Sequence, residues 1–363
     1  MTTTTDRILN FSAGPATLPE PVLEQARTDI WNVKESGIGI CEHSHRGPVF
    51  DEVLAEAVAD CRAVGQIPDE FDILFLQGGA TMQFAMVPMN FLPEGSTANY
   101  VNTGVWTSKA QKEAMKLGNV HVAYDGQPDS FDHCPSQDEL DCVPNAAYLH
   151  YCSNNTIYGT QFNHTLSDSG RIVCDMSSDI FSKPIDWNTF DMVYAGAQKN
   201  LGPSGTVLVI ARKDMLETCP DHLPSMLNYN AIAKKGSRLN TPPAFGIYLM
   251  GQVFKWIISE GGVSAMHERN TRKANYIYDA LEANSDCYRI FAQEGSRSLM
   301  NISFTTGEDV KNDSFLNEAA SQGMSGLKGH RDLGGIRASI YNAFPEEGCK
   351  RFAEFINTFA QSH

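Results

Sequence analysis

Lys199 lies in a stretch of small residues between two apolar runs. The segment from 192 to 210 reads MVYAGAQKNLGPSGTVLVI, so the lysine follows one apolar run and a glycine-rich turn leads into the next. This pattern predicts that Lys199 lies on a loop at the carboxyl end of a strand, which is where ligands bind in open α/β sheets. A single lysine is usually a surface residue, but the small neighbours leave room for a bulky ligand beside its ammonium group.

A carboxylate ends another apolar run upstream of this lysine. Asp175 closes the segment RIVCD, which reads as a strand over residues 172–175. A carboxylate in this place can simply cap the next turn. Together with Lys199 it has a second use, because pyridoxal phosphate (PLP) needs a lysine for its aldehyde and an acid against its pyridinium nitrogen. The two residues therefore indicate a PLP site.

Two glycines precede a predicted helix in the segment QGGATMQ, at 77–83. Free N–H groups at the start of a helix suit a phosphate group. Taken alone, two glycines before a helix are equally typical of a plain tight turn. Because Lys199 and Asp175 are expected in the same sheet, we interpret this segment as the site of the cofactor phosphate.

Short apolar runs alternate with helical patterns through the first two thirds of the chain. Strands are predicted over 71–76, 97–101, 147–151, 172–175, 192–195 and 206–211, and helices over 82–90 and 106–117. This alternation predicts an α/β fold, with a mostly parallel sheet covered by helices on both faces.

The pattern changes after residue 241. Longer helices are predicted over 244–258 and 264–283, followed by strands over 299–304 and 336–341 and helices over 313–322 and 346–359. We place a division near Gly261, with a large domain over residues 16–260 and a small α/β domain over 261–363. Residues 1–15 are expected to pack on the small domain.

The composition of the 363 residues excludes several classes of protein. The net charge of -15 argues against binding to nucleic acid or to an anionic membrane, so an anionic substrate needs a local basic cluster. The nine cysteines are irregularly spaced, which indicates reduced thiols in a cytoplasmic protein and no metal site. The polar start of the chain and the lack of long apolar runs predict neither a signal peptide nor a membrane span.

Beyond these patterns, the chain resembles the phosphoserine aminotransferase family of fold type I PLP enzymes. The AGAQKN-GP-G and KGHR-GG-RAS patterns are specific to this family, and the resemblance extends over nearly the whole chain. It implies a seven-stranded, mostly parallel sheet in the large domain and a smaller C-terminal α/β domain. The matching segments are FSAGPATLP at 11–19, SHRGPVF at 44–50, QGGATMQF at 77–84, YVNTGVW at 100–106, NNTIYGTQF at 154–162, CDMSSDIFSKPID at 174–186, YAGAQKNLGPSG at 194–205, NTPPAF at 240–245 and LKGHRDLGGIRASIYNA at 327–343.

The resemblance implies roles around the cofactor. Lys199 is the implied Schiff-base lysine and proton carrier, and Asp175 faces the pyridinium nitrogen. Trp106 is implied to stack on the ring, although pattern alone favours a core tryptophan, and Thr156 is implied to donate a hydrogen bond to the ring hydroxyl. The implied cofactor-binding residues are Ala80, Thr81, Trp106, Thr156, Asp175, Gln198 and Lys199, with Asn240 and Thr241 reaching the phosphate from the neighbouring subunit.

The resemblance also implies a basic substrate pocket. Arg337 is expected to hold the α-carboxylate by a bidentate fork. Some family members carry an arginine at the position of Thr81, so the residue that holds the side-chain carboxylate of glutamate is open here, with His45 and Arg46 as the expected substitutes. The implied substrate-binding residues are Ser12, His45, Arg46, His330, Arg331 and Arg337, some of them from across a homodimer interface.

The implied reaction is PLP-dependent transamination. L-Glutamate and 3-phosphohydroxypyruvate give O-phospho-L-serine and 2-oxoglutarate, as in serine biosynthesis, and the phosphorylated hydroxythreonine homologue of pyridoxine biosynthesis stays open as a second substrate. Cysteine desulfurases resemble this fold but carry histidines where this chain has Gln198 and Trp106. A non-catalytic binding protein of the same fold is disfavoured by the presence of Lys199 and Asp175.

Overall fold

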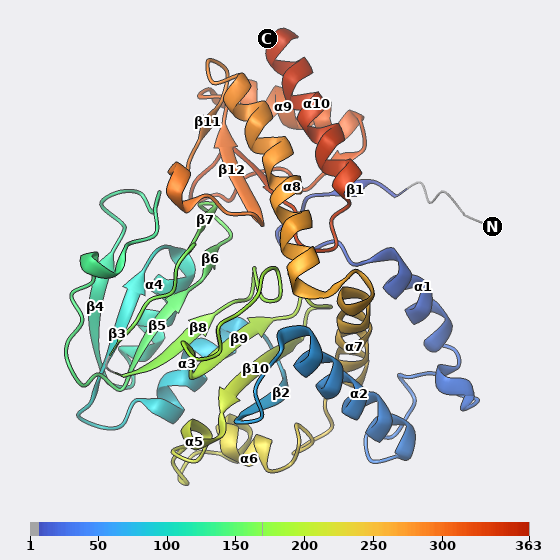
Figure 1. The fold of residues 1–363 in the computed structure, drawn as a ribbon, viewed down its shortest axis with the longest axis vertical. Helices are drawn as coiled ribbons and strands as arrows, with labels where there is room; N and C mark the ends of the chain where they lie inside the picture. Colours follow the sequence, from blue (N-terminus) through green and yellow to red (C-terminus); the bar gives the residue numbers. More distant parts are fainter. Residues whose placement is uncertain (1–6, 169, 363) are drawn as a thin grey trace.

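A seven-stranded sheet forms the centre of the computed structural model, which describes residues 7–168 and 170–362 (Figure 1). β10 runs antiparallel to both of its neighbours, and the other neighbouring strands are parallel. The predicted mostly parallel α/β fold is therefore confirmed. In spatial order the strands are β2 (Phe71–Gln77), β10 (Thr206–Arg212), β9 (Met192–Gly196), β8 (Arg171–Asp175), β5 (Tyr148–Cys152), β3 (Thr97–Asn102) and β4 (Asn119–Asp125).

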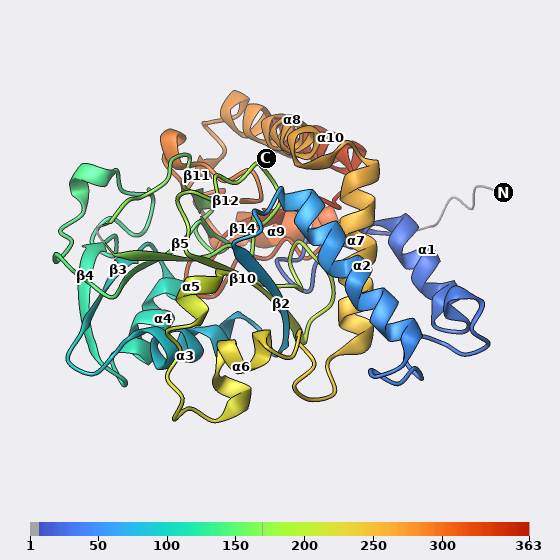
Figure 2. The same cartoon turned by 60° about the horizontal axis from the view of Figure 1, so that its bottom comes forward.

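Helices cover both faces of this sheet (Figure 2). Side chains alternate between the two faces along each strand, so neighbouring apolar residues enter different cores. On β2, Ile73 and Phe75 join one core and Leu74 and Leu76 join the other. The first core is shared with α1 (Glu20–Asp29), α2 (Pro48–Gly65) and α7 (Ala244–Ser259), and the second with α3 (Ala80–Phe91), α4 (Val105–Ala114), α5 (Lys213–Leu216) and α6 (Tyr229–Ala233).

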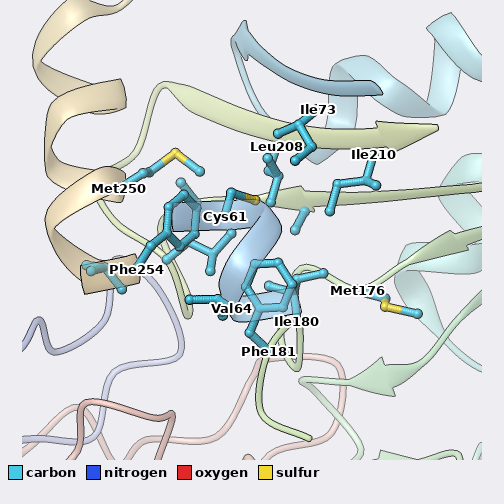
Figure 3. Packing of buried hydrophobic residues seen from close by; sticks show 14 of the residues in the cluster. Cys61, Val64, Ile73, Met176, Ile180, Phe181, Leu208, Ile210, Met250 and Phe254 are labelled. Carbon is cyan, nitrogen blue, oxygen red and sulfur yellow. The ribbon is translucent and has the colours of Figure 1, made fainter. Parts of the chain in front are cut away.

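The core beneath α2 and α7 shows why these segments form helices (Figure 3). Met250 and Phe254 on α7 are four residues apart, and Cys61 and Val64 on α2 are three apart, so each pair lies on one helix face. All four side chains are buried and pack with Leu208 of β10. This packing holds α2 and α7 against the sheet. The sheet in turn supports the loops that follow its strands.

The C-terminal part of the chain packs as a smaller α/β unit above the sheet edge (Figure 1). It has its own apolar core, which also contains Phe11 from the N-terminal segment. α7 ends at Ser259 and α8 begins at Gly262, as the glycine pair predicted, whereas the division into domains at Gly261 stays a prediction. The unit comprises α8 (Gly262–Ala283), β11 (Arg289–Ile290), β12 (Asn301–Thr305), α9 (Asp309–Ser321), β14 (Ile336–Ser339) and α10 (Glu346–Ser362).

The N-terminal segment adds a strand to this unit. β1 (Leu9–Asn10) pairs in parallel with β13 (Met324–Ser325). Residues 1–6, which belong to the segment expected to pack here, lie outside the described residues, as does residue 363. A hairpin of β6 (Asn154–Asn155) and β7 (Thr160–Gln161) completes the strands. Short 3-10 helices cover Val33–Glu35, Gln137–Glu139, Ser225–Leu227 and Glu294–Ser296.

Several element boundaries differ from the predicted ones. β14 ends at Ser339 instead of residue 341, and β12 begins at Asn301 instead of residue 299. The edge strand β4 was not predicted, because most of its side chains are only partly buried and it has no clean apolar run. α1 and α2 are also additions to the predicted elements.

All nine cysteines fall within the described residues and are free thiols. In the same ranges, no cluster of three or more histidine, cysteine or acidic side chains is arranged to hold a metal ion. None of the described helices combines the length and the apolar character needed to cross a membrane.

Candidate active site

The parallel strands bring their carboxyl ends to one edge of the sheet, where the structure has a cavity of about 330 Å³. Loops that follow β2, β3, β5, β8 and β9 form most of its wall, and the C-terminal part closes it from above. Its lining residues are Ala13, Gly14, Gly79, Ala80, Thr81, Phe84, Trp106, Cys152, Thr156, Ile157, Asp175, Ser177, Gln198, Lys199, His330 and Arg337.

Lys199 extends into this cavity three residues after the end of β9. Its Nζ donates a hydrogen bond of 2.6 Å to Thr156 Oγ1 and lies 5.5 Å from the centroid of the Trp106 ring. Burial lowers the pKa of the lysine, and the positive charge of Arg337 lowers it further, while Asp175 opposes both effects. The amine is therefore shifted toward its neutral form, in which it can accept a proton.

Asp175 is the last residue of β8 and is only 4% exposed. Ser177 donates two hydrogen bonds to its Oδ1, from the amide at 2.9 Å and from the hydroxyl at 2.6 Å. Burial raises the pKa of this carboxyl group, while Lys199 and Ser177 favour its charged form. Sequence reasoning missed Ser177, although its spacing of two residues from an aspartate is typical of an Asx turn.

Gly104 allows the loop before α4 to lie close against Asn155. A Cβ on this residue would clash with Asn155 Nδ2, and its φ of 154° also disfavours a side chain. Asn155 Nδ2 donates a hydrogen bond of 2.7 Å to the carbonyl of Thr103. This close contact brings Trp106, in the first turn of α4, to the same wall as Thr156.

The start of α3 forms another part of the cavity wall. Gly78 adopts a φ of 99°, and its amide donates a hydrogen bond of 3.0 Å to the carbonyl of Gly205. The two glycine-rich loops singled out in the sequence are therefore neighbours. Ala80 and Thr81 in the first helical turn line the cavity together with Gln198. The N–H groups of such a turn have no partner within the helix and suit an anion.

Arg337 and His330 supply the positive side of the cavity. Arg337 Nε is buried and has no hydrogen-bond partner among the described residues, so the guanidinium group can receive a ligand carboxylate. His330 Nδ1 lies 3.5 Å from Asp332 Oδ2. Burial lowers the pKa of His330, and Arg337 and Arg331 lower it further, against the opposite effect of Asp332.

Six of the predicted site residues do not line this cavity, namely Ser12, His45, Arg46, Asn240, Thr241 and Arg331. Ser12 directly precedes the lining residue Ala13. The side chain of Arg331 is 91% exposed, with its Nε 3.7 Å from Asp332 Oδ1. Asn240 donates a hydrogen bond of 3.0 Å to Gln77 Oε1 beside a separate apolar pocket. The roles given to these six residues stay predictions.

Comparison with known proteins identifies the family. The profile of aminotransferase class V matches residues 8–352. The phosphoserine aminotransferase of Desulfotalea psychrophila is 51% identical over 358 residues, which cover 99% of both chains. The chain belongs to the phosphoserine aminotransferase family. As a member of this family, it is a PLP-dependent aminotransferase.

Solved structures of the phosphoserine aminotransferase family have the same fold. The enzyme from Bacillus circulans subsp. alkalophilus superimposes with a TM-score of 0.97 at 47% identity, and the match covers 99% of each chain. The PLP-bound phosphoserine aminotransferase of Trichomonas vaginalis gives a TM-score of 0.91 at 35% identity over 96% of this chain and 99% of that one. Membership of this family implies PLP as the cofactor.

Proposed function

We propose that this chain transfers the amino group of L-glutamate to 3-phosphohydroxypyruvate, which yields O-phospho-L-serine and 2-oxoglutarate. The observation that carries the proposal is one cavity lined by Lys199, Asp175 and Arg337, in which the buried Nε of Arg337 has no hydrogen-bond partner among the described residues. The phosphorylated hydroxythreonine homologue carries the same phosphate and amino-acid groups. We include it as a second substrate of the same site, in pyridoxine biosynthesis.

The residues of the cavity fit PLP. The amine of Lys199 suits the aldehyde, the carboxylate of Asp175 suits the pyridinium nitrogen, and the indole of Trp106 suits the face of the ring. The first turn of α3, with Ala80 and Thr81, suits the phosphate together with the Gln198 side chain. When bound, PLP supplies an aromatic ring that accepts the electron pair released at the substrate Cα.

In this proposal Lys199 moves the proton. Its Nζ would take the α-proton of the bound amino acid and deliver it to the former aldehyde carbon of the cofactor within the same half-reaction, and in the second half it would carry a proton back from that carbon to the Cα of the product. Burial and the charge of Arg337 lower the pKa of the amine, which is the direction that a general base requires. Thr156 Oγ1, 2.6 Å away, orients the amine between these transfers.

Arg337 binds one charged group of the substrate, and a second group of basic residues binds the other. Arg337 holds the α-carboxylate, while His330 and Arg331 reach the substrate phosphate at the cavity mouth. His45 and Arg46 approach the same phosphate from a neighbouring subunit and also hold the side-chain carboxylate of glutamate. His45 Nε2 is buried without a hydrogen-bond partner among the described residues, which supports a ligand-binding role.

A homodimer with shared active sites is part of the proposal. An apolar pocket of about 230 Å³ lies beside the start of α3, and Asn240, Pro242 and Pro243 line it together with the 47% exposed Met82. A second copy that packs on this surface would cover these side chains and carry Asn240 and Thr241 to its partner's cofactor phosphate.

A cytoplasmic location is in keeping with the nine free cysteines.

The visible absorbance of the PLP-loaded protein tests this proposal. L-Glutamate should bleach the band of the loaded protein, and 3-phosphohydroxypyruvate should restore it. 3-Hydroxypyruvate, which lacks the phosphate, should restore it at least tenfold more slowly at equal concentration. A spectrum that glutamate leaves unchanged would refute the transamination, and equal rates with the two acceptors would refute the selection of the phosphate.

A further inference from the structure

Asn200, the residue after Lys199, forms hydrogen bonds with two distant parts of the chain. It is 6% exposed. Its Oδ1 accepts a hydrogen bond of 3.0 Å from the amide of Asn342, and its Nδ2 donates one of 2.6 Å to the carbonyl of Ile180. Asn200 is not among the described residues that line the cavity. Its side chain therefore ties the loop of Lys199 to the rest of the protein.

The amide that binds Asn200 belongs to a peptide unit that is held on both sides. The carbonyl of Tyr341 lies in the same unit as the amide of Asn342 and accepts a hydrogen bond of 2.7 Å from Lys273 Nζ. The C=O and N–H groups of a trans peptide point in opposite directions, so the unit lies between Lys273 and Asn200. Lys273 on α8 is fully buried, and its Nζ also donates a bond of 3.0 Å to the carbonyl of Ile340. The C-terminal part of the chain thus fixes the side of this unit that faces away from Asn200.

The side chain of Asn342 fixes the same peptide unit from a further direction. Asn342 is fully buried, its Nδ2 donates a hydrogen bond of 3.0 Å to the carbonyl of Phe181, and its Oδ1 accepts one of 2.7 Å from Asn270 Nδ2. Phe181 has a φ of 55°, a conformation that few residues other than glycine adopt. The carbonyls of Ile180 and Phe181 therefore bind Asn200 and Asn342 side by side.

These bonds join the loop of Lys199 to the segment that carries Arg337. Arg337 lies on β14, and Asn342 follows on the same segment, just past the end of this strand. Within the lysine loop, the amide of Gly202 donates a bond of 2.8 Å to the carbonyl of Ala197. That bond shapes the loop but does not determine where the loop lies relative to β14. The bond from Asn342 does so, because it connects the two segments directly.

We propose that Asn200 is a positioning residue for Lys199, which holds the amine in place by fastening its loop to the segment that carries Arg337. An amine reacts with an aldehyde only within a narrow range of distance and angle, so a small displacement of the loop slows the reaction. Affinity for the cofactor should not depend on Asn200, because its side chain does not line the cavity. The inference rests on the proposed function in the use it gives to Lys199, whereas the hydrogen bonds belong to the protein itself.

The test separates the affinity of the cavity from the reactivity of Lys199 in the full-length chain freed of PLP. Pyridoxine 5′-phosphate carries an alcohol in place of the aldehyde, so its binding, measured by quenching of tryptophan fluorescence, reports affinity alone. The change in visible absorbance after mixing with PLP reports the rate at which the amine of Lys199 condenses with the aldehyde and releases water. Both quantities are compared in the wild-type protein and in Asn200→Ala.

Asn90→Ala is the matched control. Asn90 is 4% exposed and also links distant segments, since its Nδ2 donates a hydrogen bond of 2.8 Å to the carbonyl of Leu227 and its Oδ1 accepts one of 3.2 Å from the amide of Tyr229. It lies near the opposite end of α3 from the cavity residue Ala80. Its loss should lower the thermal stability without changing the condensation rate.

Asn200→Ala should slow the condensation about tenfold or more, because the amine is no longer held in its reactive position. The affinity for pyridoxine 5′-phosphate should stay within about twofold of the wild-type value. A wild-type condensation rate in Asn200→Ala would overturn the proposal. A loss of affinity as large as the loss of rate, or equal slowing in Asn90→Ala, would overturn it as well, since either result would indicate a general structural effect.

Lys273→Met provides a second route if Asn200→Ala does not fold. It removes the donor on the far side of the peptide unit, so it should slow the condensation at unchanged affinity, and a wild-type rate would overturn the proposal. Where both variants fold, the double variant should be no slower than Asn200→Ala, because the two residues act through one peptide unit. Transamination can fail in the absorbance test with glutamate while these results hold, so the two proposals can fail separately. A wild-type protein in which Lys199 does not condense with PLP would refute both.

Discussion

Ser177 donates two hydrogen bonds to one carboxylate oxygen of Asp175, at 2.9 Å from its amide and at 2.6 Å from its hydroxyl. Both bonds favour the charged carboxylate at a position where burial raises its pKa. Asp175 is thereby oriented at the end of β8 by two donors that favour its charged form. A pyridinium nitrogen placed against it would keep its proton, which is what an electron-accepting ring requires.

Asp175→Asn should weaken PLP binding at least tenfold and slow transamination more strongly than it lowers stability. An amide supplies no charge to hold the pyridinium proton, but it fills nearly the same volume. PLP affinity can be measured by quenching of tryptophan fluorescence, with Asp214→Asn as a control, since Asp214 lies on the surface in an ion pair of 2.9 Å with Arg171. Unchanged affinity and rate in Asp175→Asn would remove this residue from the site.

Ser177→Ala should make PLP binding more sensitive to acid. Loss of the hydroxyl donor raises the pKa of Asp175, so the carboxylate is protonated at a higher pH and affinity is lost earlier as the pH falls. The variant should also lose about 1–2 kcal/mol of stability, because the hydroxyl accepts a bond of 3.0 Å from the Gly196 amide. Fluorescence titrations between pH 4 and 8 check the shift. The prediction would be contradicted if Ser177→Ala lost PLP affinity at the same pH as the wild-type protein. It would also be contradicted if Ser177→Thr, which keeps a hydroxyl group, showed a shift equal to that of Ser177→Ala.

Arg331→Ala should raise the KM for phosphoserine tenfold or more, which corresponds to about 1.4 kcal/mol. The phosphate carries nearly two charges at neutral pH, whereas the side chain of glutamate brings one, so the effect on the glutamate half-reaction should be smaller. Steady-state kinetics with both substrates measure the difference, and Arg351→Ala on α10 serves as a surface control. Equal losses for both substrates would assign Arg331 to the general integrity of the site.

Phosphoserine binding should depend on the protonation of His330, with a pH midpoint below the usual histidine range. Burial lowers the pKa of this residue from 6.5, so it is mostly neutral at pH 7 in the free protein. If the protonated form binds phosphate, kcat/KM for phosphoserine falls as the pH rises through a midpoint below 6.5. Asp332 raises the pKa of His330, so Asp332→Asn should move the midpoint lower still. A flat profile between pH 5 and 8 would leave only the arginines in this role.

The sequence was sufficient to predict that Lys199 and Asp175 lie close together at one edge of the sheet, where both line the same cavity. Asp175 ends one apolar run and Lys199 follows another by three residues, and parallel strands must bring their carboxyl ends to one edge, so local pattern gives their proximity. The glycine pair before α3 also follows a predicted strand, so local pattern gives its place at the same edge of the sheet. The family resemblance was needed for Trp106 and Thr156, because their positions depend on the contact between the loops at Gly104 and Asn155.

Other relationships depend on contacts between distant parts of the chain. The hydrogen bonds of the Tyr341 hydroxyl with the carbonyl of Ala13 and with Asn301 Nδ2 connect segments from both ends of the sequence, and no local periodicity encodes them. The direction of β10 also could not be read from its apolar run, since parallel and antiparallel buried strands have the same pattern. The structure of a single chain cannot place residues that are expected to come from a neighbouring subunit.

Transfer of label from [15N]glutamate is the most direct test of the central claim. With 3-phosphohydroxypyruvate as acceptor, the wild-type protein loaded with PLP should place the 15N in O-phospho-L-serine, as measured by mass spectrometry. Lys199→Ala should reduce this transfer by several orders of magnitude, because no other lysine is among the described residues that line the cavity, while Lys213→Ala on the exposed start of α5 should retain it. Absence of transfer by the wild-type protein, or undiminished transfer by Lys199→Ala, would contradict the account.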